Sequence, residues 1–302
     1  MHIGSSARPV HRRAGAAVVG LVLALVLSGC YPTSVDPPAG TGHRYSSEAF
    51  SAFTVTSDLT YGSAPDGNGD PIALKLDLYQ PTGDKAAARP VFIWAHGGSF
   101  CCGDKADGIP PIIGADFAKR GYVVLAINYR LLATSDCGGG VTDDCYNAAI
   151  DAIHDDQAAV RWARANAKTY HLDPNRIAAG GESAGAIMAT GVGLMADQPG
   201  TSGNAGHSSR VEAWVSLSGG TPGGAFVDKT DSPGYLFSGT ADTTVPYAWS
   251  QQTAESMVNF GVPVVFHTFT GAGHVPWQYA STIVDQTSNF LYKELKLATA
   301  AQ

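Results

Sequence analysis

The feature that most constrains this chain is a run of small and apolar residues from 177 to 188, Ile-Ala-Ala-Gly-Gly-Glu-Ser-Ala-Gly-Ala-Ile-Met. An apolar stretch leads into the pattern Gly-x-Ser-x-Gly, and a helix-compatible run of small residues follows directly. This order predicts a strand that turns sharply into a helix with Ser183 at the apex. Gly181 and Gly185 lie where a Cβ would collide with a neighbouring strand or helix, so the turn needs glycine at both positions.

A serine at such an apex is well placed for nucleophilic chemistry. The turn lifts the Ser183 hydroxyl clear of the sheet and over the N-terminus of the following helix. Backbone N–H groups and the helix dipole favour a developing negative charge there. Because the chain holds 36 glycines in 302 residues, the pentapeptide arises easily by chance, and other parts of the chain have to supply its partners.

Residues 1–29 are typical of an export signal and take no part in the predicted fold. Arg8, Arg12 and Arg13 form a basic start, an apolar run extends from 14 to 27, and Leu-Ser-Gly-Cys closes the segment at Cys30. The apolar run is short for a membrane span. Its ending is similar to the lipobox of bacterial lipoproteins, which implies cleavage before Cys30 and lipidation of that residue. An ordinary secreted protein with a spare cysteine is the alternative.

We therefore expect an exported protein, anchored by a lipid on Cys30 to the outer face of a membrane of the cell envelope, or else secreted. That lipid is the only membrane contact we expect. Residues 30–50 are rich in Pro, Ser, Thr and Gly and predict a flexible tether, and residues 51–302 suit one domain. Removal of 1–29 leaves 16 basic against 26 acidic side chains, a net charge of −10 without a basic cluster. This balance argues against nucleic-acid binding.

The pattern of apolar segments predicts an α/β fold. Segments beginning at Phe53 and over 72–79 alternate as half-buried antiparallel strands do. Continuous apolar runs over 91–95 and 122–127 indicate strands covered on both faces. One more strand ends just before Ser183, and three others occupy 211–217, 235–238 and 264–269. Helices are expected between strands at 110–120, 155–168 and 249–260, and a closing helix at 283–297. This alternation predicts a mostly parallel eight-stranded sheet with helices on both faces.

Two connections bear on what the domain can bind. Asp66-Gly-Asn-Gly-Asp70 superficially resembles a calcium loop, but Asn-Gly between two strands is a strong hairpin signal and the rest of a calcium loop is missing. A turn is therefore the favoured interpretation. The stretch 218–233 is rich in glycine and has no helical period, which predicts a site without a large lid.

A second motif, His96-Gly97-Gly98-Ser99-Phe100, follows the third predicted strand at the edge of the sheet where such folds place ligands. Its small residues let the backbone curl so that N–H groups point at an incoming carbonyl oxygen. Together with the N–H of Ala184, those of Gly98 and Ser99 are predicted to form an oxyanion hole. His96 is expected to orient this loop.

An acid and a base follow two later strands. Asp242 comes just after the strand 235–238, where its carboxylate can hold an imidazole in one tautomer. His274 lies in a glycine-rich loop after the strand 264–269, where its ring can move a proton. We predict a catalytic triad of Ser183, Asp242 and His274. Four other histidines lie in a strand, in a polar loop or at helix edges and are less suited to this role: His154, His171, His207 and His267.

Taken together, these motifs resemble the α/β-hydrolase superfamily, in its esterase and lipase branch with an HGG oxyanion loop. That branch includes type-B carboxylesterases, hormone-sensitive-lipase-like esterases and feruloyl-esterase-like enzymes. The matching residues are His96 to Phe100, Asn128 to Arg130, Asp156 to Trp162, Asp173 to Ile177, Gly181 to Gly185, Gly239 to Asp242, and Gly273 with His274. Ser99 replaces a third glycine and Ala186 replaces a glycine often found after the elbow, and neither change removes a backbone donor.

The resemblance implies an α/β-hydrolase catalytic domain over 51–302 that hydrolyses small or medium acyl or aryl esters through an acyl-enzyme on Ser183. It implies no cofactor and no metal. Gly181, Glu182 and Gly185 would support the elbow, as His96 and Gly97 would support the oxyanion loop. The motifs do not specify the substrate. An exported serine peptidase or amidase and a non-catalytic binding lipoprotein are the alternatives, and a monomer whose partner is a small-molecule ester is the expectation.

Four cysteines follow Cys30: Cys101, Cys102, Cys137 and Cys145. Export permits disulfides, and four thiols allow three complete pairings, so we expect one or two structural bridges without choosing between them. Because no histidine stands at zinc-ligand spacing from these cysteines, a metal site is not expected.

Aromatic residues flank the predicted acid and base loops. Tyr247, Trp249, Trp277 and Tyr279 are candidates for the lining of a pocket that takes an apolar acyl or aryl group. Ordinary core or surface packing is the alternative interpretation.

Overall fold

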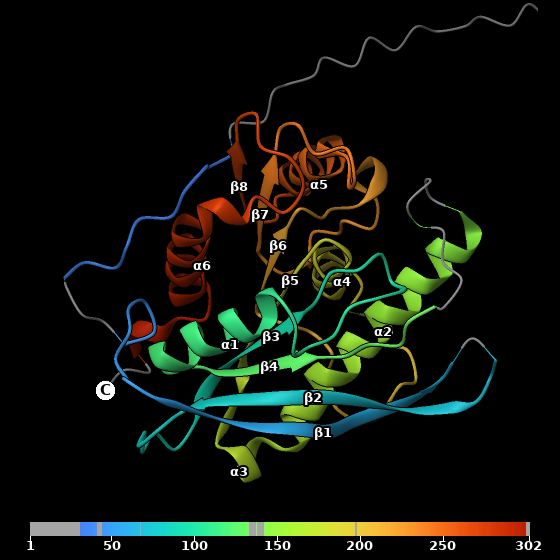
Figure 1. Ribbon diagram of the computed structural model, residues 1–302. Coiled ribbons are helices and arrows are strands. Elements are labelled where there is room, and N and C mark those ends of the chain that lie inside the picture. The colour runs from blue at the N-terminus through green and yellow to red at the C-terminus, as the bar shows by residue number, and fades with distance from the viewer. Residues whose placement is uncertain are drawn as a thin grey trace, which may run out of the picture.

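The computed structural model of the protein describes residues 31–40, 44–66, 68–132, 137, 142–196 and 198–299 (Figure 1). The predicted export signal 1–29 and Cys30 lie outside the described residues. An eight-stranded sheet with the strand order β1-β2-β4-β3-β5-β6-β7-β8 forms the centre of the molecule. Its strands are β1 Phe53–Pro65, β2 Pro71–Pro81, β3 Arg89–Ala95, β4 Val123–Ile127, β5 Leu172–Glu182, β6 Ala213–Leu217, β7 Gly234–Gly239 and β8 Val264–Phe269.

The sheet is mostly parallel, as the sequence predicted. The strand β2 pairs antiparallel with β1 and β4, and every other neighbouring pair runs parallel. All seven residues of β3 are buried, with Val91, Ile93 and Ala95 facing one layer of helices and Phe92 and Trp94 facing the other. This continuous burial is why the inner strands are apolar throughout.

Helices cover both faces of the sheet (Figure 1). The helices α1 and α6 pack on one face, and α2, α4 and α5 pack on the other. The helices are α1 Ile109–Arg120, α2 Asp143–Ala165, α3 Ala167–Tyr170, α4 Ala184–Leu194, α5 Tyr247–Phe260 and α6 Ala280–Glu294, with 3-10 turns at Pro222–Gly224, Trp277–Tyr279 and Leu297–Thr299. No helix of the described chain is long and apolar enough to cross a membrane.

The helix α2 begins twelve residues earlier than the sequence predicted. Its start is fixed by Thr142, whose hydroxyl accepts the Cys145 N–H at 3.1 Å, and by two aspartates in the first turn, Asp143 and Asp144. A capping hydroxyl and acidic residues at this end stabilise the helix. The predicted first residue, Asp155, lies in the helix interior.

The described part of the segment 30–50 packs on the domain, which corrects the prediction of a flexible tether. Tyr31 lies against the ring of Phe266 with centroids 5.4 Å apart, and the Phe266 N–H donates to the Pro32 carbonyl at 2.9 Å. Further along, Tyr45 is buried, and its N–H donates to the Arg120 carbonyl at 2.8 Å. Aromatic burial and paired backbone groups hold these residues in place, despite their surroundings of Pro, Ser and Thr.

Two loops agree with the sequence analysis. The strands β1 and β2 form a hairpin in which Asp66 Oδ1 accepts the N–H groups of Asn68 and Asp70. Residues 218–233, all of them described, contain only the 3-10 turn Pro222–Gly224 between β6 and β7. The prediction that no large lid covers the site is therefore confirmed for this connection.

The indole of Trp214 is tightly packed between the sheet and the helices. The buried indole of Trp214 donates its Nε1–H to the Ser232 carbonyl at 3.0 Å, and Gly193 and Gly234 lie against its ring. A Cβ on Gly234 would come well within 3.0 Å of that ring. We expect Gly234→Ala to lower the free energy of unfolding by about 1–3 kcal/mol, measured by urea denaturation.

The matched control for this prediction is Ser288→Ala. The Ser288 hydroxyl is buried and has no hydrogen-bond partner among the described residues, so its removal is expected to be neutral or slightly stabilising. Equal stability of Gly234→Ala and the wild type would show that the contact around Trp214 is loose.

Candidate active site

The turn between β5 and α4 presents Ser183 at its apex. Ser183 has φ 56° and ψ −118°, a conformation that non-glycine residues rarely adopt. Its N–H donates to the Leu217 carbonyl at 3.0 Å, which ties the apex to the neighbouring strand β6. A Cβ on Gly185 would collide with the Ala95 carbonyl, and one on Gly181 would collide with the Gly185 backbone. The close approach of β3, β5 and α4 therefore requires glycine at both positions.

The structure brings Ser183, His274 and Asp242 into one hydrogen-bonded line. His274 Nε2 lies 2.8 Å from Ser183 Oγ, and His274 Nδ1 lies 2.8 Å from Asp242 Oδ2. The three residues follow the carboxyl ends of β5, β8 and β7, which all meet at one edge of the sheet. Because the carboxylate accepts a hydrogen bond from Nδ1–H, the ring proton stays on Nδ1 and Nε2 is free to accept the Ser183 hydroxyl proton.

Backbone N–H groups of its own loop hold the Asp242 carboxylate in place. The Asp242 side chain is fully buried, and its Oδ1 accepts the N–H groups of Thr244 at 3.0 Å and Val245 at 3.1 Å. These bonds compensate the burial of the charge and leave Oδ2 for the imidazole. A fixed carboxylate in turn fixes the orientation of the His274 ring.

Sequence reasoning missed a residue that positions the base. The Val275 N–H, next to His274, donates to Ser218 Oγ at 3.0 Å, and Ser218 itself has φ 61° at the end of β6. The Ser218 N–H donates to the Phe237 carbonyl at 2.8 Å. The only signal in the sequence is a polar residue before two glycines at a strand end, which is a common pattern.

The loop 96–100 lies against the nucleophile. A Cβ on Gly97 would lie 3.1 Å from Ser183 Cβ, so the loop starts in contact with the serine. Gly98, Ser99 and Phe100 all have positive φ, at 122°, 51° and 60°. Ala184, the third predicted oxyanion donor, is the first residue of α4, where a backbone N–H has no acceptor within the helix.

Glu182 links the elbow to this loop. Its Oε1 accepts the Gly97 N–H at 3.0 Å and its Oε2 accepts the indole N–H of Trp94. Burial raises the pKa of Glu182 to about 7, although both hydrogen bonds act in the opposite direction. Glu182 was predicted only as part of the elbow motif. Its contact with Trp94 joins residues 88 apart in the chain, which no local sequence pattern indicates.

His96 holds the start of the same loop. Its Nδ1–H donates to the Gly97 carbonyl at 2.6 Å, and its ring stacks on Tyr129 with centroids 4.5 Å apart. Tyr129 in turn donates its hydroxyl to the His96 carbonyl at 3.1 Å. Burial lowers the pKa of His96, which favours the neutral imidazole. These contacts agree with the expectation that His96 orients the loop.

An apolar cavity of about 90 Å³ lies beside the elbow helix. Its walls come from α2, α4, the loop 220–226 and Phe100. Of the four aromatic residues expected there, only Trp249 contributes to the lining. The others pack elsewhere, which corrects that expectation: Tyr247 stacks on Phe266, Tyr279 stacks on Phe269, and Trp277 packs against the core between the sheet, α1 and α6.

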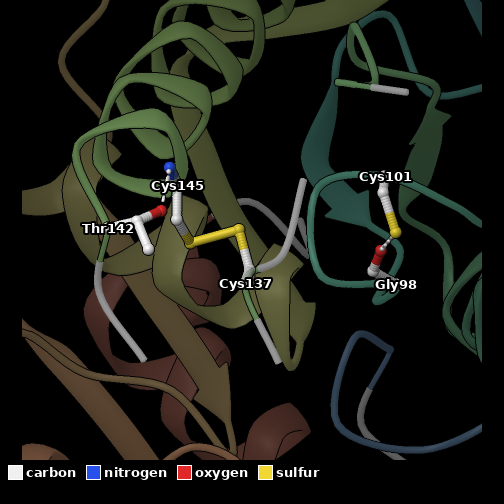
Figure 2. Close-up of a disulfide and its surroundings, with 5 residues drawn as sticks. All are labelled: Gly98, Cys101, Cys137, Thr142 and Cys145. Atoms are coloured by element: carbon white, nitrogen blue, oxygen red, sulfur yellow. Dashed lines mark hydrogen bonds between the residues drawn. A yellow bond between two sulfur atoms is a disulfide. The ribbon is translucent and has the colours of Figure 1, made fainter. Parts of the chain in front are cut away.

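One disulfide joins Cys137 to Cys145 in the first turn of α2 (Figure 2). This bridge agrees with the expectation of one or two structural disulfides. Cys101 and Cys102 are free thiols beside each other, with a sulfur–sulfur distance of 2.8 Å. Within the described part of the chain, no three His, Cys, Asp or Glu side chains form a group that suits a metal ion.

Solved structures similar to this one show that the chain has the α/β-hydrolase fold. A truncated carbohydrate esterase from gut microbiota superposes with a TM-score of 0.66 at 22% identity, covering 80% of this chain and 96% of that one. Esterase 2 of Thermogutta terrifontis, phosphorylated by paraoxon, superposes with a TM-score of 0.62 at 26% identity, covering 81% and 94%.

Sequence comparisons point in the same direction. The profile of the BD-FAE family matches residues 76–222, a stretch that contains the loop 96–100 and Ser183 but neither Asp242 nor His274. Human bile salt-activated lipase is 34% identical over 139 residues, which are 44% of this chain and 17% of the lipase. Fumonisin B1 esterase of Sphingopyxis macrogoltabida is 31% identical over 150 residues, 47% of this chain and 26% of that esterase. The chain thus matches about a quarter or less of the length of these two relatives.

The buried carboxyl of Glu182 makes a pH-dependent contribution to stability. Its pKa rises from 4.5 to about 7 on folding, so between these values the native state binds more protons than the unfolded chain. Ionisation therefore destabilises the fold as the pH rises, by about 3 kcal/mol over the whole window. We expect the free energy of unfolding of the wild type, minus that of Glu182→Gln, to fall by about this amount between pH 4 and pH 8. A difference that stays constant would contradict the raised pKa.

Proposed function

We propose that this protein is a serine carboxylic-ester hydrolase that works through Ser183, His274 and Asp242. The observation that carries the proposal is the hydrogen-bonded line from Ser183 Oγ through the His274 ring to the buried Asp242 carboxylate, with 2.8 Å at both contacts. The loop 96–100 starts in contact with the serine, which supports the proposal that its N–H groups serve as donors to a carbonyl oxygen. The lipase and esterase names of the similar proteins support the same chemistry.

The proposed reaction has two steps. Ser183 Oγ attacks the ester carbonyl carbon while its proton passes to His274 Nε2, and Asp242 stabilises the resulting imidazolium. The N–H groups of Gly98, Ser99 and Ala184 receive the oxyanion. His274 then gives the proton to the leaving alkoxide oxygen. Water attacks the acyl-enzyme by the same route and frees the acid. The chemistry requires no cofactor beyond these groups.

The apolar cavity supports esters with an apolar acyl group. On α4, the lining residues Ile187 and Gly191 follow Ser183 at intervals of four residues, so they lie on the helix face below the proposed nucleophile. On α2, an apolar stripe at helical spacing forms the opposite wall: Tyr146, Ala149, Ile150 and Ile153. The described lining contains no residue of the His274 loop, so the alcohol side of the ester is assigned to the space beside that loop and the acyl side to the cavity.

We also propose the location and state that the sequence suggests: an exported monomer with a lipid on Cys30, or a secreted one. The support for this proposal is the sequence of residues 1–30. The mass of the N-terminal peptide of the mature protein tests it, because cleavage before Cys30 with acylation gives a peptide heavier than its unmodified sequence.

The central test is hydrolysis of p-nitrophenyl esters from C2 to C16 by the protein from Tyr31 onward. We expect measurable turnover, and a loss of at least about 10⁴-fold in kcat for Ser183→Ala, because the nucleophile is removed. An unchanged circular dichroism spectrum of the variant is the control for folding. Absence of turnover with every ester would overturn the proposal and favour the amidase or the non-catalytic binding protein.

The acyl side is tested by filling the cavity. Ala149→Phe introduces a ring into the α2 wall, and we expect kcat/KM for hexanoate relative to acetate to fall by about tenfold or more. Ala165→Phe is the matched control, because Ala165 is exposed at the other end of the same helix. If the hexanoate-to-acetate ratio of Ala149→Phe equals that of the control, the cavity does not hold the acyl chain.

A further inference from the structure

Two adjacent thiols follow the loop 96–100, and the proposed reaction uses neither of them. Cys102 is exposed, Cys101 is partly buried, and their sulfur atoms lie 2.8 Å apart, well inside van der Waals separation. Neither takes part in the disulfide, which joins Cys137 to Cys145 (Figure 2). Neighbouring thiols this close can be oxidised to a disulfide. Because Cα atoms of adjacent residues are only about 3.8 Å apart, below the usual ~4.4–6.8 Å of a disulfide, closure also strains the peptide group between them.

The backbone of these two cysteines holds one end of a peptide group in the oxyanion loop. The Gly98 carbonyl accepts the N–H groups of Cys101 and Cys102, both at 3.0 Å. It also accepts the thiol of Cys101 at 3.4 Å, as Figure 2 shows. This carbonyl and the Ser99 N–H belong to the same planar peptide group and point in opposite directions. Holding the carbonyl therefore sets the direction of the Ser99 N–H, one of the proposed oxyanion donors.

The loop depends on this support because its backbone is strained. Ser99 and Phe100 have φ of 51° and 60°, values that cost non-glycine residues of order 1–3 kcal/mol each. Such conformations persist only where surrounding contacts impose them. One of these contacts is direct packing, since the Cys102 carbonyl fills the space that a Cβ on Gly98 would need.

We propose that Cys101 and Cys102 form a redox modification site, and that their closure to a vicinal disulfide turns the peptide group between Gly98 and Ser99 and slows ester hydrolysis. The effect on catalysis rests on the proposed function. The oxidant is a low-molecular-weight disulfide. One cysteine thiolate attacks it and releases the first small thiol, and the second cysteine attacks the mixed disulfide and releases the other. One sulfur–sulfur bond breaks and one forms, the cysteines lose two electrons, and both protons leave with the two small thiols or the solvent.

Closure of the ring acts on each bond that holds the Gly98 carbonyl. The sulfur–sulfur distance shortens from 2.8 Å to about 2.05 Å, and the peptide between Cys101 and Cys102 becomes part of an eight-membered ring. That peptide carries the Cys102 N–H, one of the two backbone donors to Gly98. The Cys101 thiol proton, the third donor, is lost. Because an oxyanion donor acts mainly in the transition state, the change lowers kcat and leaves KM nearly unchanged.

The experiment compares the protein in reduced and in oxidised glutathione, with p-nitrophenyl acetate as substrate. We expect kcat of the wild type to fall by about tenfold in the oxidised buffer, less than the ~10²–10³-fold cost of losing a whole donor, and to recover on return to the reduced buffer. Peptide mass spectrometry should show the loss of two hydrogen atoms from the peptide with both cysteines. The Cys137–Cys145 peptide is followed in every sample, so that its reduction is recognised.

Cys102→Ser is the matched control. It keeps the Cys102 backbone N–H and the Cys101 thiol, but it cannot close the ring, so its kcat should be equal in both buffers. Ring closure in the wild type without a change in kcat would overturn the inference and leave the esterase proposal intact. A glutathione adduct in place of the ring would also overturn it. Absence of hydrolysis in the reduced buffer would instead contradict the proposed function, which is thereby tested separately.

Discussion

The site depends on the close approach of β3, β5 and α4 behind Ser183. Gly185 packs on the Ala95 carbonyl, and this contact brings the end of β3 to the apex of the elbow. The loop after β3 thereby reaches the serine, and Glu182 ties the two together through the Gly97 N–H. A single Cβ at Gly185 would separate Ser183, the proposed nucleophile, from the proposed oxyanion donors of the loop. The positive φ of Ser183 is tolerated because the surrounding backbone contacts impose it.

Two buried carboxyl groups have different environments within the same site. Asp242 accepts two backbone N–H groups on one oxygen and the His274 ring on the other, so its charge is compensated and directed at the base. Glu182 is buried and accepts two N–H groups, and this burial raises its pKa to about 7. The first carboxylate orients the His274 ring, and the second orients the loop that holds the proposed oxyanion donors. Both therefore act by positioning other groups.

The sequence was sufficient to predict the fold, and it singled out the three side chains that lie in one hydrogen-bonded line. The eight strands, the order Ser183, Asp242 and His274, and the open connection over 218–233 follow from local patterns of hydrophobicity and glycine. Contacts between distant segments were beyond such patterns: Trp94 with Glu182, and Ser218 with the backbone beside His274. The polar composition of the segment 30–50 predicted a flexible tether, but Tyr31 and Tyr45 pack on the domain and hold its described part in place. The four aromatic residues near the acid and base loops were close in sequence, but only Trp249 faces the cavity.

Covalent labelling with a fluorophosphonate, followed by peptide mapping, tests directly whether Ser183 is the nucleophile. We predict one adduct per chain, on Ser183, because its hydroxyl lies 2.8 Å from His274 Nε2 and beside the proposed oxyanion donors. Replacing His274 with alanine should slow the labelling strongly while the fold is retained. Labelling of another serine, or labelling of Ser183 in His274→Ala at the wild-type rate, would contradict the proposed triad.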